Sequence, residues 1–140
     1  MKLDSKDISI IGELRRDGRA SIRDIARATG IRPSTVHIRI NRLISEGVIE
    51  KFTLKLNNEA FGEHFIAFLL VKSDGEISQK AFAHPAVREV FGVTGEYDLL
   101  IKVKFSDIKA FHDFLLAFRK QAHVGETVTM VSTVTVKEEL

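Results

Sequence analysis

Apolar residues in the first third of the chain recur every three or four positions, which is the spacing of helices with one buried face. The pattern predicts three helices, at about 4–17, 22–29 and 33–46. A glycine follows each predicted end, where the left-handed backbone that terminates a helix is favoured. Ser21 with Asp24 predicts a capping box for the second helix, and Pro33 suits the first position of the third.

From Val48 onward the period of the pattern changes to two. Residues 52–56 alternate between apolar and polar side chains, which predicts a half-buried strand. The asparagines and the glycine between 57 and 63 indicate a turn or linker. We therefore divide the chain into 1–50, a strand and linker at 51–63, and a second domain at 64–140.

The second domain alternates strand and helix patterns. Apolar runs predict strands at 65–71, 87–94, 97–105 and 127–137, with a hairpin joining the middle two through Gly95 and Glu96. Helices are predicted at about 76–83 and from Ser106 and Asp107 to about 122–125. The inner face of the second of these helices is predicted to carry Ile108, Phe111, Leu115 and Phe118, with Phe114 alongside. The order βαββαβ is that of a ferredoxin-like domain, so the fold class is α+β, with a helix-turn-helix of winged type at the N-terminus.

Composition and charge narrow the possible functions. The chain has 140 residues, 44% hydrophobic and 29% charged, which suits two small domains. Its net charge of +2 hides a division, because residues 1–55 carry +5 and residues 56–140 carry −3. The absence of Cys excludes disulfides and thiol chemistry, and no apolar run is long enough to span a membrane. We expect a cytoplasmic protein with no membrane partner.

The third predicted helix carries the candidate chemistry for reading double-stranded DNA. Two helices joined by a short glycine-containing turn are typical of a helix-turn-helix, whose second helix enters the major groove. Amide, guanidinium and methyl groups can read base edges there. Opposite the apolar stripe of this helix lie Ser34, Ile38, Asn41, Arg42 and Ser45, with Thr35 and His37 on the flanks. A purely structural interpretation stays open, in which Arg42 pairs with Glu46 and Arg39 holds an acid within the domain.

Several motifs resemble those of the Lrp/AsnC family of prokaryotic transcription regulators, over essentially the whole chain. The N-terminal pieces are Leu3-Asp4 with Asp7, Asp17-Gly18-Arg19, Ile25-Ala26, Gly30, Thr35-Val36-x-x-Arg39-Ile40-x-x-Leu43 and Gly47-Val48-Ile49. Further on, Thr94-Gly95-Glu96-Tyr97-Asp98-Leu99 is similar to the signature turn of the ligand-sensing domain, usually Gly-Asp-Tyr-Asp. Arg32 replaces the serine that often caps the recognition helix, so Arg32 becomes a candidate for contact with the DNA backbone.

The turn from Gly95 to Asp98 is the candidate effector site. Its backbone N–H groups could bind a carboxylate and Asp98 could bind an ammonium group, as an amino-acid ligand requires. Spacing alone is also compatible with an ordinary hairpin, and the resemblance implies amino-acid binding near this turn at contacts between dimers. We count Glu96, Tyr97 and Thr129 with the site, although threonines in strands are often simply good strand formers.

Assembly and chemistry complete the sequence-based expectations. An apolar sheet face left over by two helices predicts a homodimer, and the resemblance implies that dimers associate further. The contributors that we expect on one face or the other are Phe65, Ala67, Leu69, Val71, Leu99, Ile101 and Val103. The histidines lack metal-ligand spacing and no phosphate-binding loop occurs, so we expect neither an enzyme nor a metal or cofactor. The alternative function is an amino-acid-binding module that regulates an enzyme by protein–protein contact.

Overall fold

The computed structural model describes residues 2–140, which form two compact units that divide between Leu54 and Lys55. Each unit has a hydrophobic core of its own. No helix within residues 2–140 is long and apolar enough to cross a membrane.

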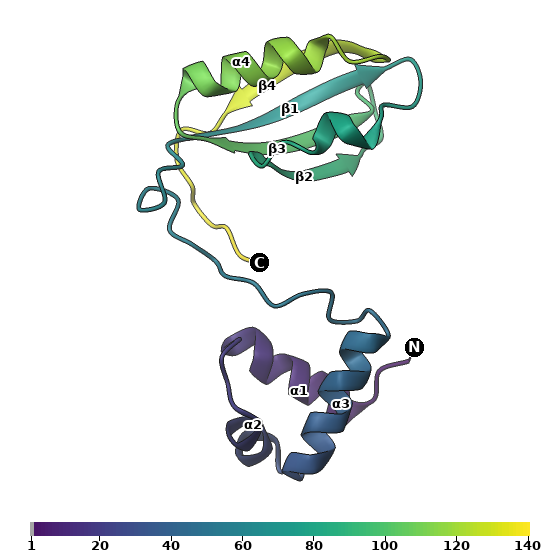
Figure 1. Cartoon of the computed structure of the whole chain (residues 1–140), viewed down its shortest axis with the longest axis vertical. Helices are drawn as coiled ribbons and strands as arrows, with labels where there is room; N and C mark the ends of the chain where they lie inside the picture. The colour runs from purple at the N-terminus through teal and green to yellow at the C-terminus, as the bar shows by residue number, and fades with distance from the viewer. Residues whose placement is uncertain (1) are drawn as a thin grey trace. The chain divides into compact units, whose positions relative to one another are not determined.

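The N-terminal unit consists of three helices, α1 (Ser5–Arg16), α2 (Ile22–Thr29) and α3 (Pro33–Ser45), as the sequence predicts (Figure 1). Ile10, Ile25 and Val36 are buried where the three helices meet. The predicted capping box of α2 is confirmed, since the Ser21 side chain accepts from the Asp24 N–H and the Asp24 side chain accepts from the Ser21 N–H. Local sequence signals therefore define this unit well.

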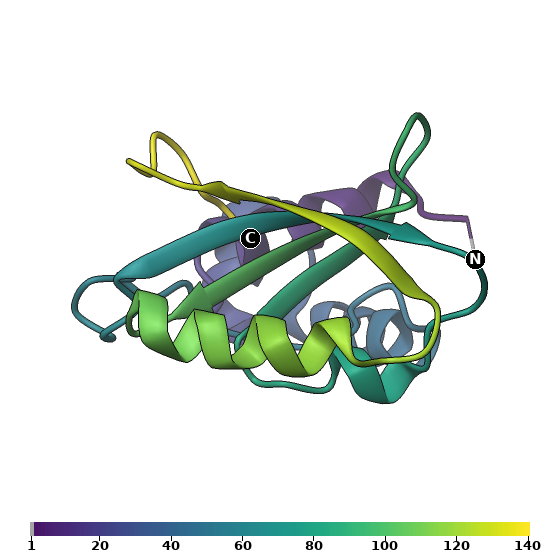
Figure 2. The ribbon, with the colours of Figure 1, turned by 90° about the horizontal axis from the view of Figure 1, so that it is seen from above.

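The C-terminal unit is a four-stranded antiparallel sheet of β1 (Phe65–Ser73), β2 (Val87–Gly92), β3 (Leu99–Phe105) and β4 (Val124–Val131) in the order β2-β3-β1-β4. Helix α4 (Ile108–Arg119) lies across one face of the sheet (Figure 2). A short 3₁₀-helix, η1 (Gln79–Phe82), connects β1 to β2. The strand order and connections confirm the predicted ferredoxin-like fold.

Strand register decides which side chains face α4. Residues of β1 alternate, so that Ala67, Leu69 and Val71 are fully buried against the helix-covered side. All seven residues expected for one sheet face or the other belong to this core or pack against it. The opposite face, here called the open face, instead presents Phe68, Leu70, Leu100, Val128 and Met130, which are aligned by register.

Expectations about three elements and one side chain are wrong. Residues 52–56 form no strand and Phe52 and Leu54 are exposed, because the chain offers this segment no hydrogen-bonding neighbour within residues 2–140. The final strand runs from Val124 to Val131 rather than from 127 to 137. The helix expected at 76–83 shortens to η1, and Ile108 at the start of α4 is exposed rather than inward-facing.

Candidate functional site

Helix α3 presents a mixed polar and apolar surface opposite its buried side. Val36 and Leu43 are fully buried, whereas Ile38 on the far side is 66% exposed. We call the exposed surface of this helix the α3 face. It comprises Ser34, Thr35, His37, Ile38 and Asn41, of which Thr35 is half-buried. The exposed Ile38 side chain adds an apolar group to this otherwise polar surface, next to groups that can donate and accept hydrogen bonds.

The N-terminus of α3 begins as the sequence predicts. Pro33 occupies the first helical turn, and Arg32 precedes it without a side-chain capping hydrogen bond. On the α3 face, Asn41 Nδ2 lies 3.2 Å from His37 Nε2, one helical turn earlier. If the histidine carries its proton on Nδ1, this contact orients the Asn41 amide and leaves its oxygen and its second N–H available.

An ion-pair cluster attaches α3 to the start of α1. Asp7 is fully buried, and its carboxylate lies 2.8 Å from Arg39 Nη1 and 2.8 Å from Arg42 Nη2. The same Arg39 nitrogen lies 2.7 Å from the carboxylate of Asp4. The hydrogen bond from Arg39 holds the pKa of Asp4 at about 2, below its usual value of 3.8. We call Asp4, Asp7, Arg39 and Arg42 the α1–α3 cluster.

In this cluster, Arg39 and Arg42 of α3 form ion pairs with acids at the start of α1, so they differ in role from the residues of the α3 face. The structural interpretation of Arg39 is confirmed, because that side chain holds two acids of its own domain. Arg42 pairs with Asp7 rather than with Glu46, while 43% of its side chain remains exposed. Sequence reasoning missed Asp7 as the partner. The available signal was the Asp4–Asp7 capping box, which fixes a buried carboxylate at the start of α1.

Exposed basic side chains lie on α2 and on the connections that precede α2 and α3. Arg23 and Arg27 belong to α2, and Arg19 and Arg32 lie in the connections before α2 and α3. Arg27 is 3.8 Å from Asp24 in an exposed pair, which is a weak contact in water. These arginines therefore remain accessible to an anionic partner.

The second candidate site is the connection between β2 and β3. Gly95 adopts φ 113°, a conformation that other residues rarely reach, so the tight turn depends on glycine there. Asp98 fastens the turn to the end of β1, because its Oδ2 accepts from the Ser73 N–H at 2.8 Å and its own N–H donates to the Val71 oxygen at 2.9 Å. The turn is thus held by a carboxylate that also faces solvent.

Charged groups gather beside this turn. Lys72 Nζ lies 3.2 Å from Glu96 and 3.6 Å from Glu126, and 5.3 Å from the centre of the Tyr97 ring. The Tyr97 hydroxyl donates to Glu126 at 3.2 Å. Hydrogen bonding to Glu96 raises the pKa of Lys72, and desolvation followed by the Glu126 contact raises the pKa of Tyr97. Both groups therefore keep their protons at neutral pH.

Thr129 does not join this group. It pairs with Leu69, which is buried on the helix-covered side of the sheet. Thr127, two residues earlier on the same side, accepts a hydrogen bond from Arg119 of α4. Strand alternation therefore directs Thr129 away from Lys72 and Glu126, so the predicted set divides between the two faces.

A hollow of about 370 Å³ lies close to the turn, between η1 and the sheet. Ile77, Phe82, Val90 and Leu99 give it an apolar floor, and Glu76 and Gln79 add polar groups at its edge. Ser73 lines the hollow, and its backbone N–H donates a hydrogen bond to the Asp98 carboxylate. An apolar side chain bound here would therefore lie near a carboxylate that can accept from an ammonium group.

Comparison with known proteins supports both halves of this description. Residues 3–50 match the winged helix-turn-helix DNA-binding model, and residues 66–140 match the Lrp/AsnC ligand binding domain. An uncharacterized HTH-type transcriptional regulator of Pyrococcus horikoshii is 40% identical, with 99% of this chain and 97% of the relative covered. The HTH-type transcriptional regulator FL11 of Pyrococcus furiosus is 37% identical, with 92% and 88% covered.

A solved structure extends the similarity to three dimensions. The feast or famine regulatory protein of Mycobacterium tuberculosis, complexed with L-methionine, superposes with a TM-score of 0.87 at 28% identity, over 98% of this chain and 96% of that one. The protein is thus a DNA-binding transcription regulator rather than an enzyme. Specifically, the chain belongs to the Lrp/AsnC family.

Proposed function

We propose that this regulator reads specific DNA sequences through the α3 face. The observation that carries the proposal is the exposure of Ile38 beside Asn41 and His37, opposite a fully buried side. An asparagine can pair with adenine through two hydrogen bonds, and the Ile38 side chain can contact a thymine methyl group. Thr35 and Ser34 lie near the helix start, the part of a recognition helix that approaches base edges.

The arginines take the phosphate contacts in this proposal. Arg32 is exposed just before α3, where it can reach the DNA backbone without disturbing the fold. Arg42 contributes less charge, because Asp7 already neutralises one side of its guanidinium group. Its exposed part still allows a phosphate contact, while the pair with Asp7 fixes its position. The relatives named above come from prokaryotes, whose DNA lies in the cytoplasm, so we propose a cytoplasmic location.

The proposed effector is a free amino acid bound at the Gly95–Asp98 turn. Asp98 supplies an acceptor for the ammonium group, and Glu96 and Tyr97 line the same end of the sheet. The neighbouring apolar hollow suits an apolar side chain. The Mycobacterium tuberculosis relative in complex with L-methionine supports this ligand class. Because Thr129 faces the helices, we give it no direct contact with the ligand in this chain.

We further propose that the open face forms a homodimer and that dimers associate into larger assemblies. Phe68 and Met130 are neighbours by register, and 45% of Met130 is exposed. Apolar side chains aligned over three strands form an association surface. The unpaired segment 52–56 can add a strand to a partner, since its alternating pattern already suits a sheet.

A gel-shift assay with a salt titration tests the DNA proposal on the promoter region of the protein's own gene. We expect binding that weakens steeply as salt rises, through counterion release from phosphates. Asn41→Ala should cost about 1–3 kcal/mol and relax sequence preference, whereas Arg32→Ala should weaken all sequences and lower the salt slope by about one. Arg15→Ala, an exposed change on α1, is the control. Equal binding by all three variants and the parent would remove α3 from the interface.

A further inference from the structure

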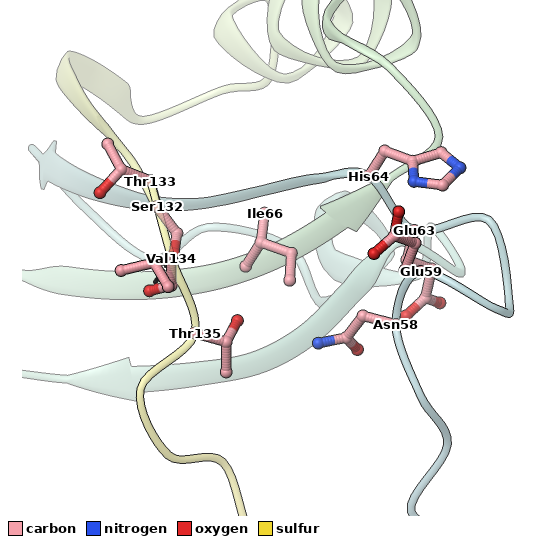
Figure 3. A pocket seen from close by; sticks show the side chains of 9 residues that line it. All are labelled: Asn58, Glu59, Glu63, His64, Ile66, Ser132, Thr133, Val134 and Thr135. Atoms are coloured by element: carbon pink, nitrogen blue, oxygen red, sulfur yellow. Dashed lines mark hydrogen bonds between the residues drawn. The ribbon is translucent and has the colours of Figure 1, made fainter.

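The last nine residues of the chain lie beside the linker rather than in the sheet. After β4 ends, the Ser132 N–H donates to the Ile66 oxygen at 2.8 Å, and the chain then leaves the strand. Residues 132–135 and the turn that contains Asn58 and Glu63 form opposite walls of a hollow of about 320 Å³ (Figure 3). The C-terminal segment therefore passes close to the residues that lead to the second domain.

Glu138 joins these two segments. Its side chain is 12% exposed, and Oε1 lies 2.9 Å from Lys55 Nζ and 2.8 Å from Lys104 Nζ. Oε2 lies 2.5 Å from Lys102 Nζ. Asn58 completes the group, because its amide donates to Glu138 at 3.4 Å and its oxygen accepts from Lys104 at 2.7 Å. We call these five residues the Glu138 cluster.

The cluster connects three parts of the chain through one carboxylate. Lys102 and Lys104 project from β3, Lys55 and Asn58 belong to the linker, and Glu138 belongs to the C-terminal segment. Burial alone would raise the pKa of Glu138, but the three lysines together hold it well below its usual range. The carboxylate is therefore ionised throughout the neutral range. Among residues 2–140, removal of its charge leaves Lys104 without a carboxylate partner, whereas Lys102 keeps Glu89, whose Oε2 lies 3.4 Å from its Nζ.

We propose that Glu138 is a positioning residue that fixes the linker to the ligand-binding domain and so sets how the DNA-binding domains are presented. The part that concerns DNA rests on the proposed function. A linker held at Lys55 and Asn58 leaves fewer residues free between the domains, which raises the effective concentration of the second DNA-binding domain of a dimer at its half-site. The C-terminal segment thereby becomes part of the connection between ligand binding and DNA binding.

Distances between spin labels test the first half of the proposal. The chain has no cysteine, so Leu56→Cys and Val136→Cys, both at exposed positions, allow labelling of the linker and the C-terminal segment. The labelled chain is diluted with unlabelled chain to suppress distances between subunits. We expect a narrow distribution in the parent and a broad one after Glu138→Gln or Lys55→Met. Glu139→Gln is the matched control, because Glu139 is 74% exposed and pairs with Lys137.

DNA binding tests the second half. Glu138→Gln and Lys55→Met should weaken binding to an operator with two half-sites by roughly tenfold and leave binding to one half-site unchanged. Glu139→Gln should alter neither. An unchanged label distribution after Glu138→Gln would overturn the fixed linker, and a broadened distribution with unchanged operator affinity would overturn its role in DNA binding. If the parent binds no DNA, the proposed function fails, whereas the label distances still decide the position of the linker.

Discussion

Replacement of Asp7 by alanine should destabilise the N-terminal unit far more than any change to a surface acid. Asp7 is fully buried and carries two arginines on one carboxylate. Removal of one partner of a buried ion pair usually costs 3–5 kcal/mol, because the remaining charge is left without compensation. Arg39 keeps its ion pair with Asp4, and Arg42 is partly exposed and can turn toward water, so we take the lower end, about 3 kcal/mol. For a unit of this size the melting temperature should fall by roughly 12–24 °C.

Two optical signals separate the domains in one thermal scan of the full chain. Circular dichroism at the helix band is dominated by α1, α2 and α3, while the single tyrosine, Tyr97, reports on the other unit through its fluorescence. Asp7→Ala should lower the melting temperature followed by circular dichroism and leave the melting temperature followed by Tyr97 fluorescence unchanged. Glu13→Gln removes an acid from an exposed pair with Arg16 and should cost no more than about 1 kcal/mol. Equal shifts for both variants would refute the importance of the α1–α3 cluster.

Three further predictions concern acid stability, the effector and assembly. The pKa of Asp4 is lowered from 3.8 to about 2, so its contribution to stability is complete above pH 3.8 and is lost as the pH falls through 2. The variant Asp4→Asn still caps α1, and its stability, followed by circular dichroism, should depend less on pH between 3.8 and 2 than that of the parent. Asp98→Asn should weaken the binding of an amino acid tenfold or more, measured by calorimetry. The control Asp74→Asn, which changes an exposed acid paired with His123, should leave the affinity unchanged. Equal affinities for the two variants would leave Asp98 without a role in binding. Met130→Glu on the open face should convert dimers to monomers, as measured by sedimentation velocity. The control Leu116→Glu on α4, where the side chain is also 45% exposed, should remain dimeric. If Met130→Glu is still a dimer, the open face is not the dimer interface.

The sequence predicted best those features that depend on neighbours along the chain. The ends of α2 and α3 follow from Ser21, Pro33 and the glycines after them, and Gly30 and Gly47 indeed adopt φ of 71° and 70°. Each of these signals acts within one helical turn. The same holds for Asp107, which caps α4 as predicted.

Features that depend on a partner far away in the sequence were harder to predict from the sequence. Alternation at 52–56 is a genuine strand pattern, but a strand also needs a neighbour, and the sequence does not show whether one exists. Arg42 has an acid four residues away in Glu46, yet it pairs with Asp7, far away in sequence. For Thr129, the face depends on its register with Leu69, which spacing within β4 cannot reveal.

The location of β1 in the middle of its sheet affects how the chain can be completed during synthesis. β1 leaves the ribosome before either of its neighbours, since β3 and β4 are encoded later and pair with it across long stretches of sequence. Helices α1–α3 make local contacts and can fold early. One edge of β1 can pair with β3 once β3 has emerged, while the other edge stays open until β4 emerges. A nascent chain stalled before Val124 therefore exposes an apolar strand with an unpaired edge, and we expect such fragments to aggregate or to require a chaperone.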